Sequence, residues 1–430
     1  MLRLNTREPG FDAAFQRLVS DRRESAADLA RDVEAILGDV KNRGDAALAE
    51  MTARWDGHTL ASDADWQFTA DQCREAFDAL KPDLRAALEL AAARIRAFHE
   101  KQLPANRDET DDAGVRMGAI WRGVDAAGLY VPGGRAAYPS SLLMNAIPAK
   151  VAGVERLVVV TPTPKGQFNP LVLAAAHLAG VDEVWRIGGA QAVAALAYGT
   201  DRIKPVDVIT GPGNAWVAEA KRQLYGVVGI DMVAGPSEIL LIADAMNDPQ
   251  WTAADLLSQA EHDPAAQSIL ITDDAAFADR VAEQVQAELA MLPTAKVATE
   301  SWNTHGTIIE VASLNEAPAL ANALAAEHVQ IATDDPEALM RQIRHAGSVF
   351  LGRMTPEAVG DYVAGPNHVL PTGRRARFSS GLSVLDFMKR TSFIQLDENA
   401  LKAIGPAAIE LADAEGLPAH ARSIEVRLKI

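Results

Sequence analysis

Two runs of alternating strand and helix patterns occupy the middle of this 430-residue chain. In the first run, helical patterns alternate with three apolar segments, which are RLVVVTP (156–162), EVWRIGG (183–189) and VDVITGPG (206–213). In the second run, the strand candidates are SEILLIAD, SILITDD and HGTIIEV. Such alternation is typical of parallel sheets with right-handed crossovers. We therefore predict an α/β protein with two Rossmann-like parallel-sheet domains and a cleft between them, which is a common place for a substrate.

The two ends of the chain have helical patterns instead. Apolar residues spaced three and four apart run from residue 1 to about 128, and again through the tail from 382 up to a strand-like SIEVRLKI. We expect a helical N-terminal segment at 1–25, a larger discontinuous α/β domain at 26–128 and 239–380, a smaller α/β domain at 129–238 and a helical C-terminal tail at 381–430.

Composition excludes several classes of function. The net charge of −17 argues against nucleic acid or an anionic membrane as a partner, because both bind basic patches. The N-terminus lacks the apolar segment of a secretory signal, and charged residues interrupt the most apolar run, so we expect no membrane span and a cytoplasmic location. The single cysteine, Cys73, lies in a helical pattern and is expected to pack in a core.

Three glycine-rich turns lie in the first α/β run, although the GxGxxG fingerprint is missing. They are YVPGGRAAYPSS (130–141), IGGAQAV (187–193) and ITGPGNAW (209–216). Turns of this kind let backbone N–H groups at helix N-termini approach a phosphate. Three of them in one region make dinucleotide binding as good an interpretation as plain tight turns.

The segment from 360 to 392 begins without a helical or strand period and carries Asp361 and His368. Long irregular connections in compact domains are usually functional or disordered. Apolar residues are spread through this segment, and it runs directly into the apolar LSVLDF. We therefore interpret it as an ordered active-site loop.

Polar pairs elsewhere supply candidate ligands and bases. Gln259 and His262 lie three apart on one predicted helix and share a face, which could hold a metal. By itself, the pair fits a surface Gln beside a hydrogen-bonding His better. Glu327 and His328, expected at a helix end, suit proton transfer or a histidine favoured by the helix dipole. Asp361 and His420 would complete a zinc site with Gln259 and His262, but spacing alone does not bring the four together.

Taken together, these segments resemble the histidinol dehydrogenase family over nearly the whole chain. The resemblance is carried by residues 130–154, 187–200, 211–226, 231–244, 259–267 and the 360–392 loop, with EGLPAHARSIEVRL near the end. It implies oxidation of L-histidinol through L-histidinal to L-histidine with reduction of two NAD⁺, the last two steps of histidine biosynthesis. It also implies one Zn²⁺ per subunit and a homodimer formed through the tail.

The resemblance also assigns residues. It implies zinc ligands at Gln259, His262, Asp361 and His420, with the zinc anchoring the substrate. It makes Glu327 and His328 the acid–base pair. Because an imidazole titrates near neutrality, we expect His328 to be the general base and Glu327 to activate water for aldehyde oxidation. Further substrate contacts would come from Ser237, His368 and Glu415, and NAD⁺ contacts from Tyr130, Gln191 and Asn214. The tail would cross to the neighbouring subunit, so Glu415 and His420 would complete that subunit's site.

Other interpretations of the same residues stay open. A zinc- and NAD-dependent dehydrogenase of another amino alcohol or diol would use the same scaffold. A zinc hydrolase would use Glu327 to activate a metal-bound water, but it has no need of the three glycine-rich turns. A non-catalytic metal-binding module fits least well with two α/β units and a cleft.

Overall fold

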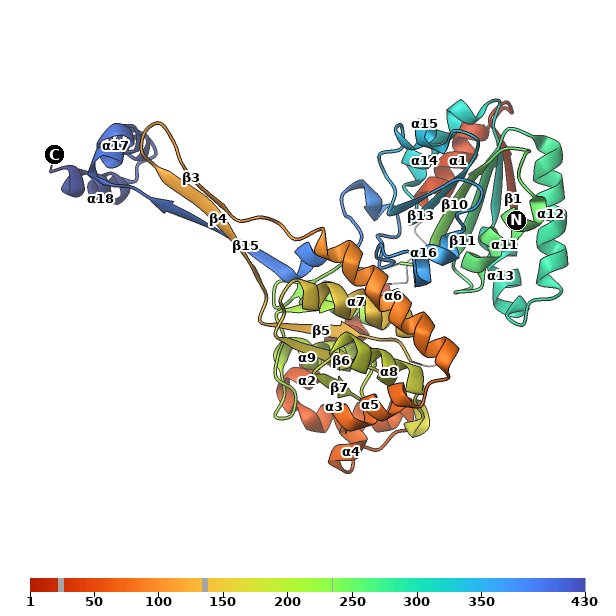
Figure 1. Cartoon of the computed structure of the whole chain (residues 1–430), viewed down its shortest axis with the longest axis horizontal. Helices are drawn as coiled ribbons and strands as arrows, with labels where there is room; N and C mark the ends of the chain where they lie inside the picture. Colours follow the sequence, from red (N-terminus) through yellow and green to blue (C-terminus); the bar gives the residue numbers. More distant parts are fainter. Residues whose placement is uncertain (22–26, 134–137, 234, 430) are drawn as a thin grey trace.

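The computed structural model describes residues 1–21, 27–133, 138–233 and 235–429. Two α/β lobes lie side by side, and a long arm leaves the first lobe and ends in a pair of helices (Figure 1). This arrangement confirms the predicted α/β class with two parallel-sheet domains.

The first lobe is built on a six-stranded sheet with the order β2-β7-β6-β5-β8-β9. All its strands are parallel except β2, which pairs antiparallel with β7. The strands are β2 (Gln67–Phe68), β5 (Ala126–Tyr130), β6 (Arg156–Val160), β7 (Glu183–Trp185), β8 (Val208–Thr210) and β9 (Gly229–Ile230). Two apolar cores cover the two faces of this sheet, each formed with a separate group of helices.

One of these cores contains α2 (Ala27–Arg43), α3 (Asp45–Asp56), α9 (Gly189–Tyr198) and α10 (Ala215–Leu224). The other contains α5 (Ala70–Asp78), α6 (Pro82–Glu100), α7 (Pro139–Val151) and α8 (Pro170–Ala179). Cys73 is buried in this second core, as expected for a packed thiol. Local signals set the ends of these helices: the Asn169 side chain caps the start of α8, and Gly180 ends it in a left-handed conformation.

The helices between residues 27 and 100 therefore belong to the first lobe. α2 packs on α9, α5 on α8 and α6 on α7. The expected division grouped residues 26–128 with the second α/β run, so the structure differs from it. The spacing of apolar residues predicts a helix and its buried face, but it does not say which sheet this face will cover.

The second lobe is built on a parallel six-stranded sheet with the order β1-β12-β11-β10-β13-β14. Its strands are β1 (Leu2–Asn5), β10 (Glu238–Ala243), β11 (Gln267–Thr272), β12 (Thr307–Glu310), β13 (His328–Ala332) and β14 (Ser348–Leu351). The N-terminal segment, expected to be helical, contributes the edge strand β1 before the helix α1 (Phe11–Ser20).

Helices cover both faces of this second sheet. One core includes α1 with α14 (Ala317–Leu324) and α15 (Pro336–Met340). The other includes α11 (Pro249–Ala260), α12 (Ala275–Leu289) and α13 (Ala295–His305). Among the residues that the structure describes, no helix is long and apolar enough to cross a membrane.

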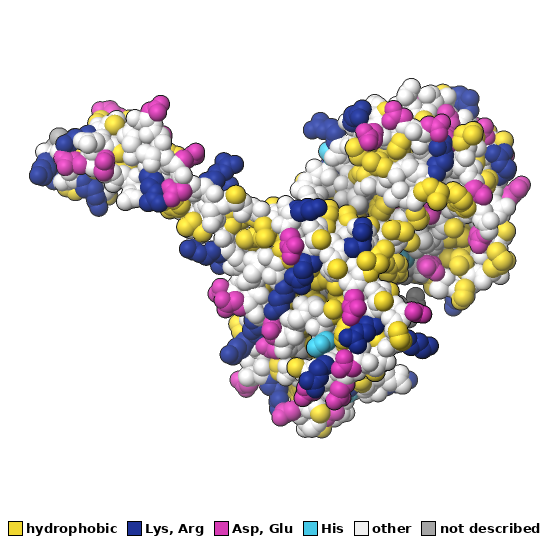
Figure 2. Space-filling model, viewed as in Figure 1, with side chains coloured by type: hydrophobic (Ala, Val, Ile, Leu, Met, Phe, Trp, Pro, Cys, Tyr) yellow, Lys and Arg dark blue, Asp and Glu magenta, His cyan; other side chains and the backbone are white. Residues whose placement is uncertain are grey.

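The arm combines segments that are far apart in the sequence. β3 (Arg107–Thr110), β4 (Arg116–Gly123) and β15 (Met388–Gln395) form an antiparallel sheet, followed by α17 (Glu398–Ala414) and α18 (Pro418–Leu428) (Figure 1). The expected helical tail thus begins with a strand. Acidic and basic side chains are mixed over the arm and both lobes (Figure 2).

The strand-like SIEVRLKI is helical in the structure as far as Leu428. Its alternating apolar residues suggested a strand, but Ile424 and Leu428 are also four residues apart. Both lie against Gly405 of α17, so α18 packs its helical face on that helix.

Candidate active site

The expected acid–base pair lies where β13 begins. Glu327 immediately precedes the strand and His328 is its first residue, and the two are only 6% and 3% exposed. The prediction that this pair ends a helix is wrong, because α14 stops at Ala325, which adopts a left-handed conformation with φ of 49°. The pair is consequently held by the ladder of a central strand, next to β10.

The surroundings of His328 give its two ring nitrogens different roles. Nδ1 lies 3.1 Å from the backbone carbonyl oxygen of Glu238. Because a carbonyl only accepts, Nδ1 carries the hydrogen and Nε2 holds the lone pair of the neutral ring. Nε2 lies 3.6 Å from Oε1 of Glu357 and 3.6 Å from Oδ1 of Asp361. The basic nitrogen therefore faces two carboxylates.

Burial and charge shift the pKa of both members of the pair. Burial raises the pKa of Glu327 to about 8, although its Oε2 accepts a hydrogen bond of 3.0 Å from the Glu238 N–H. Burial alone would lower the pKa of His328, but the nearby carboxylates of Glu327, Asp361 and Glu357 raise it to about 10. The cluster holds more acidic than basic groups, which favours a cation beside it.

Three of the four expected zinc ligands lie on or next to two helices that contact each other. Gln259 lies in the last turn of α11 with 1% exposure, His262 follows just after the helix, and Asp361 lies near the end of α16 (Glu357–Tyr362). The His262 side chain is exposed at the surface, but the protein atoms around it displace enough water to lower its pKa. The negative charge of Asp361 acts in the opposite direction.

Several buried oxygens at this place have no hydrogen-bond partner within the described part of the chain. They are Oε1 of Gln259, Oε1 of Glu357 and Oδ1 of Asp361. Buried polar atoms are normally satisfied, so three together require an explanation. Carboxylate and amide oxygens beside imidazole nitrogens are a donor set that suits a divalent ion such as zinc. The residues present therefore fit the metal that the sequence implies.

Glu357 was missed by sequence reasoning. Its side chain is buried and accepts a hydrogen bond of 3.2 Å from Ser258 Oγ. One potential ligand atom each from Glu357, His328 and Asp361 lie within 4.8 Å of one another. Burial, followed by the charge of Asp361, raises the pKa of Glu357 to about 7. The spacing of four between Glu357 and Asp361 on a short helix was the signal that could have identified it.

The loop after α16 turns His368 toward the same cluster. Nδ1 of His368 lies 2.9 Å from the backbone oxygen of Asp361, and Nε2 lies 3.2 Å from Ser141 Oγ. Burial lowers the pKa of this imidazole. Ser237 immediately precedes β10, beside the backbone of Glu238 that holds His328. Both expected substrate contacts are thus adjacent to the acid–base pair.

The other two expected site residues lie elsewhere. Glu415 follows α17 and His420 lies on α18, and both helices are at the tip of the arm, far from α11 and α16 (Figure 1). A single chain therefore places Gln259, His262 and Asp361 on or next to neighbouring helices but does not bring His420 to them.

The expected cofactor residues gather at the carboxyl edge of the first sheet. Tyr130 ends β5, and its hydroxyl accepts a 3.0 Å hydrogen bond from the Gly189 N–H at the start of α9. Burial raises the pKa of Tyr130 to about 12. Gln191 is buried in the first turn of α9, and Asn214 caps α10 by accepting from two backbone N–H groups at 3.1 and 3.2 Å. Two helix N-termini thus lie at this edge, and the N-terminus of a helix favours a bound anion.

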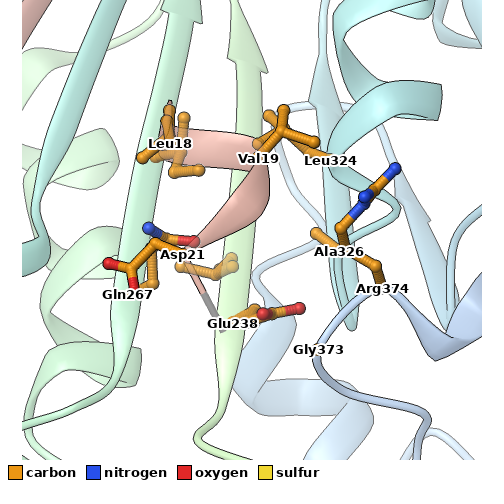
Figure 3. A pocket seen from close by; sticks show the side chains of 11 residues that line it. Leu18, Val19, Asp21, Glu238, Gln267, Leu324, Ala326, Gly373 and Arg374 are labelled. Atoms are coloured by element: carbon orange, nitrogen blue, oxygen red, sulfur yellow. The ribbon is translucent and has the colours of Figure 1, made fainter. Parts of the chain in front are cut away.

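A small cavity lies near Glu238 but is not a substrate pocket. Its volume is about 10 Å³, and its lining includes Leu18, Val19, Glu238, Gln267 and Arg374 (Figure 3). A cavity of this size holds about one water molecule.

Comparisons with known proteins agree with this geometry. The family model for histidinol dehydrogenase matches residues 19–428. Histidinol dehydrogenase from Zymomonas mobilis is 63% identical over 428 residues, covering 100% of this chain and 99% of that protein. The Rhodospirillum rubrum enzyme is 60% identical over 428 residues, covering 99% and 98%.

A crystal structure extends the agreement to three dimensions. The histidinol dehydrogenase of Elizabethkingia anophelis superposes with a TM-score of 0.94 at 35% identity, covering 100% of this chain and 98% of that one. The chain therefore belongs to the histidinol dehydrogenase family.

Proposed function

We propose that this protein oxidises L-histidinol through L-histidinal to L-histidine and reduces two NAD⁺, the last two steps of histidine biosynthesis. Membership of the histidinol dehydrogenase family supports the activity. The single structural observation that carries the mechanism is the orientation of His328, whose Nε2 faces the buried carboxylates while Nδ1 is engaged by a backbone carbonyl.

In the first oxidation, His328 acts as the general base. A zinc ion bound beside it would offset the charge of the neighbouring carboxylates that raise its pKa, so that the neutral ring could act as a base. Its Nε2 then removes the proton of the substrate alcohol while the carbon gives up a hydride. NAD⁺ supplies the acceptor for that hydride, and Tyr130, Gln191 and Asn214 are proposed to contact it at the carboxyl edge of the first sheet. The Glu238 carbonyl keeps the ring in the tautomer that this step needs.

The second oxidation converts the aldehyde to the acid by adding water. Glu327 takes a proton from water as the water oxygen attacks the aldehyde carbon, and His328, protonated in the first oxidation, gives its proton to the aldehyde oxygen, which yields a gem-diol. The diol then gives up a hydride from carbon to the second NAD⁺ and a proton to His328. A cysteine adduct is not available from Cys73, because this thiol is buried in the first lobe and burial raises its pKa to about 11.

Zinc is proposed to be held by Gln259, His262 and Asp361 together with His420 of the partner subunit. When bound there, the ion would neutralise part of the carboxylate charge and anchor the amine and imidazole of the substrate. Ser237, His368 and Glu415 of the partner subunit are proposed to complete the substrate contacts. The buried oxygens Oε1 of Gln259 and Oδ1 of Asp361, which have no hydrogen-bond partner within the described residues, support this assignment.

A homodimer with exchanged arms would supply the missing residues. Glu415 and His420 lie on an arm that projects from the body, and several apolar side chains of its helices are exposed, including Leu411 at 64% and Val426 at 50%. A second copy would cover these side chains and receive the two polar residues in its own site. The cytoplasmic location expected from the sequence stays a prediction.

The experiment that tests the proposal counts NADH formed from L-histidinol. Two NADH per L-histidinol, with L-histidine as the product, is the expected result. One NADH with accumulation of the aldehyde would contradict the second step, and no NADH would contradict the activity. A zinc hydrolase would form no NADH with any amino alcohol, and the family comparisons do not support that alternative.

A further inference from the structure

A buried ion pair lies beneath the proposed cofactor edge of the first lobe. Lys221 on α10 and Asp231, just after β9, are in direct contact, and their side chains are only 2% and 1% exposed. Burying two charges carries a desolvation cost that often exceeds their attraction, so such a pair is weak evidence for stability. Its position suggests another role.

The pair holds one residue of the chain from both sides. The Gly211 N–H donates to Oδ2 of Asp231 at 2.9 Å, and Nζ of Lys221 donates to the Gly211 carbonyl oxygen at 3.0 Å. Gly211 has a φ of 111°, and an added Cβ would collide with the backbone of Tyr130. Its backbone is thus fixed in position, with no freedom to accept a side chain.

Gly211 lies where the order of the strands reverses. It follows β8, which pairs with β5, while β6 and β7 continue on the other side of β5. In open α/β sheets, ligands bind in the crevice at such a switch point, outside the carboxyl ends of the strands. Three residues after Gly211, Asn214 caps α10, so the same turn sets where the helix N-terminus points.

The Asp231 carboxylate also begins the connection to the second lobe. Its Oδ1 accepts a 2.6 Å hydrogen bond from the Met232 N–H, and the chain then runs to Ser237 and β10. On the way, the Gly235 N–H donates to Thr372 Oγ1 of the active-site loop at 2.6 Å. One carboxylate therefore fixes both the turn of the first lobe and the start of the chain segment that leads to the acid–base pair.

We propose that Lys221 and Asp231 are positioning residues that hold the turn at 211–214 in the conformation that receives the dinucleotide phosphates. The proposal rests on the function proposed above and adds the pair that determines cofactor affinity. Neither side chain touches the reacting atoms, so the expected effect falls on cofactor binding and not on the chemical step.

The first test removes the charge of either partner. Lys221→Met and Asp231→Asn should each raise the KM for NAD⁺ by about tenfold or more, since a small misplacement of a positioning group has large effects. The KM for L-histidinol and the bound zinc should change less than about twofold. The matched control is Arg156→Met, which breaks the 2.7 Å pair of Arg156 with Glu183 at the amino edge of the same sheet and should leave both KM values unchanged.

A second variant separates positioning from stability. Lys221→Met combined with Asp231→Leu replaces the pair with apolar side chains and should keep the thermal stability of the parent while the KM for NAD⁺ stays high. If the folded double variant binds NAD⁺ as tightly as the parent, by titration calorimetry, the proposal is wrong. If the parent itself forms no NADH, the proposed function fails, whereas unchanged NAD⁺ affinity in variants of an active parent overturns only this inference.

Discussion

The two lobes share one strand order but present opposite edges to the site. In the first sheet, β5 is central and the order of the strands reverses between β5 and β8, which are parallel. In the second, β10 is central and the order reverses between β10 and β13, which are also parallel. The first lobe places Tyr130 and Gly211 at carboxyl ends of strands, whereas the second places Glu238 and His328 at amino ends.

Helix polarity explains why the same topology can suit an anion in the first lobe and a cation in the second. Helices begin at the carboxyl edge of such a sheet, so α9 and α10 direct positive N-termini toward the proposed cofactor phosphates. Helices end at the amino edge, so α11 brings its negative C-terminus, with Gln259, to the proposed cation. One edge suits an anion and the other suits a cation and a base.

Removing the metal should have the largest effect of these changes. This effect should be confined to the second lobe. Exhaustive chelation is expected to reduce oxidation of L-histidinol to background, because the substrate loses its anchor at Gln259, His262 and Asp361. NAD⁺ affinity, measured by titration calorimetry, should change little, because its proposed contacts lie in the other lobe. Full activity of a preparation shown to be free of metal would contradict the assigned site.

His328→Asn should slow both oxidations by about 10²- to 10⁴-fold, which is the usual contribution of a general base. The rate of NADH formation would be measured separately with L-histidinol and with L-histidinal. Retention of the KM for NAD⁺ serves as the control for an intact first lobe. A loss confined to one of the two substrates would argue against a shared base.

Glu327→Gln should separate the two steps. Alcohol oxidation should be largely retained, since His328 is still present, while aldehyde oxidation slows by about 10²-fold or more because water is no longer activated. Rapid mixing would then show one fast NADH per site, followed by a slow second. Equal slowing of both steps would refute this division of labour.

The smallest expected effect concerns the contact between the active-site loop and the first lobe. His99 is fully buried; its Nδ1 lies 2.7 Å from the Ile95 carbonyl oxygen, so Nε2 accepts from the Asn367 amide at 3.3 Å. Burial lowers its pKa below the ordinary 6.5, so the unfolded chain binds this proton more readily. The stability that neutral His99 provides is therefore present above about pH 6.5 and is lost as the pH falls below it.

The test compares the thermal midpoint of the parent and of His99→Gln at pH 7.5 and at pH 5.5. The parent should lose a few degrees more than the variant on acidification, because the variant has no imidazole to protonate. Equal losses in the two proteins would show that His99 does not contribute to the acid sensitivity.

The sequence predicted six strands of the two sheets, β6, β7, β8, β10, β11 and β12, because each is a short apolar segment between helical patterns. It did not predict β1 or β13, which lie in segments expected to be helical. It also predicted that Gln259 and His262 would be neighbours, since helical spacing is a local property. It did not predict that α2 to α6 cover the first sheet, because the partner of an apolar face depends on long-range packing. Glu357 was missed for a similar reason: its role appears only when β13 brings His328 beside α16.

The arm was the least predictable part. β3 and β15 are mostly exposed and β4 is half-buried, and β15 pairs with β4 only because residues 116–123 and 388–395 meet across a long sequence separation. A strand of this kind has no alternation between a buried and an exposed face, so periodicity gives little signal. The placement of Glu415 and His420 follows from this arm, and no local pattern could have shown it.

If the arms are exchanged, each working centre is assembled from two polypeptides, and two different defects need not fall on the same centre. A copy carrying His328→Asn keeps an intact arm, and a copy carrying His420→Ala keeps an intact body. When the two are produced together, the mixed pair contains one centre with both defects and one with neither. Two genes that each encode an inactive variant would then together support growth of a cell without added histidine. A site completed within one chain would not allow this outcome.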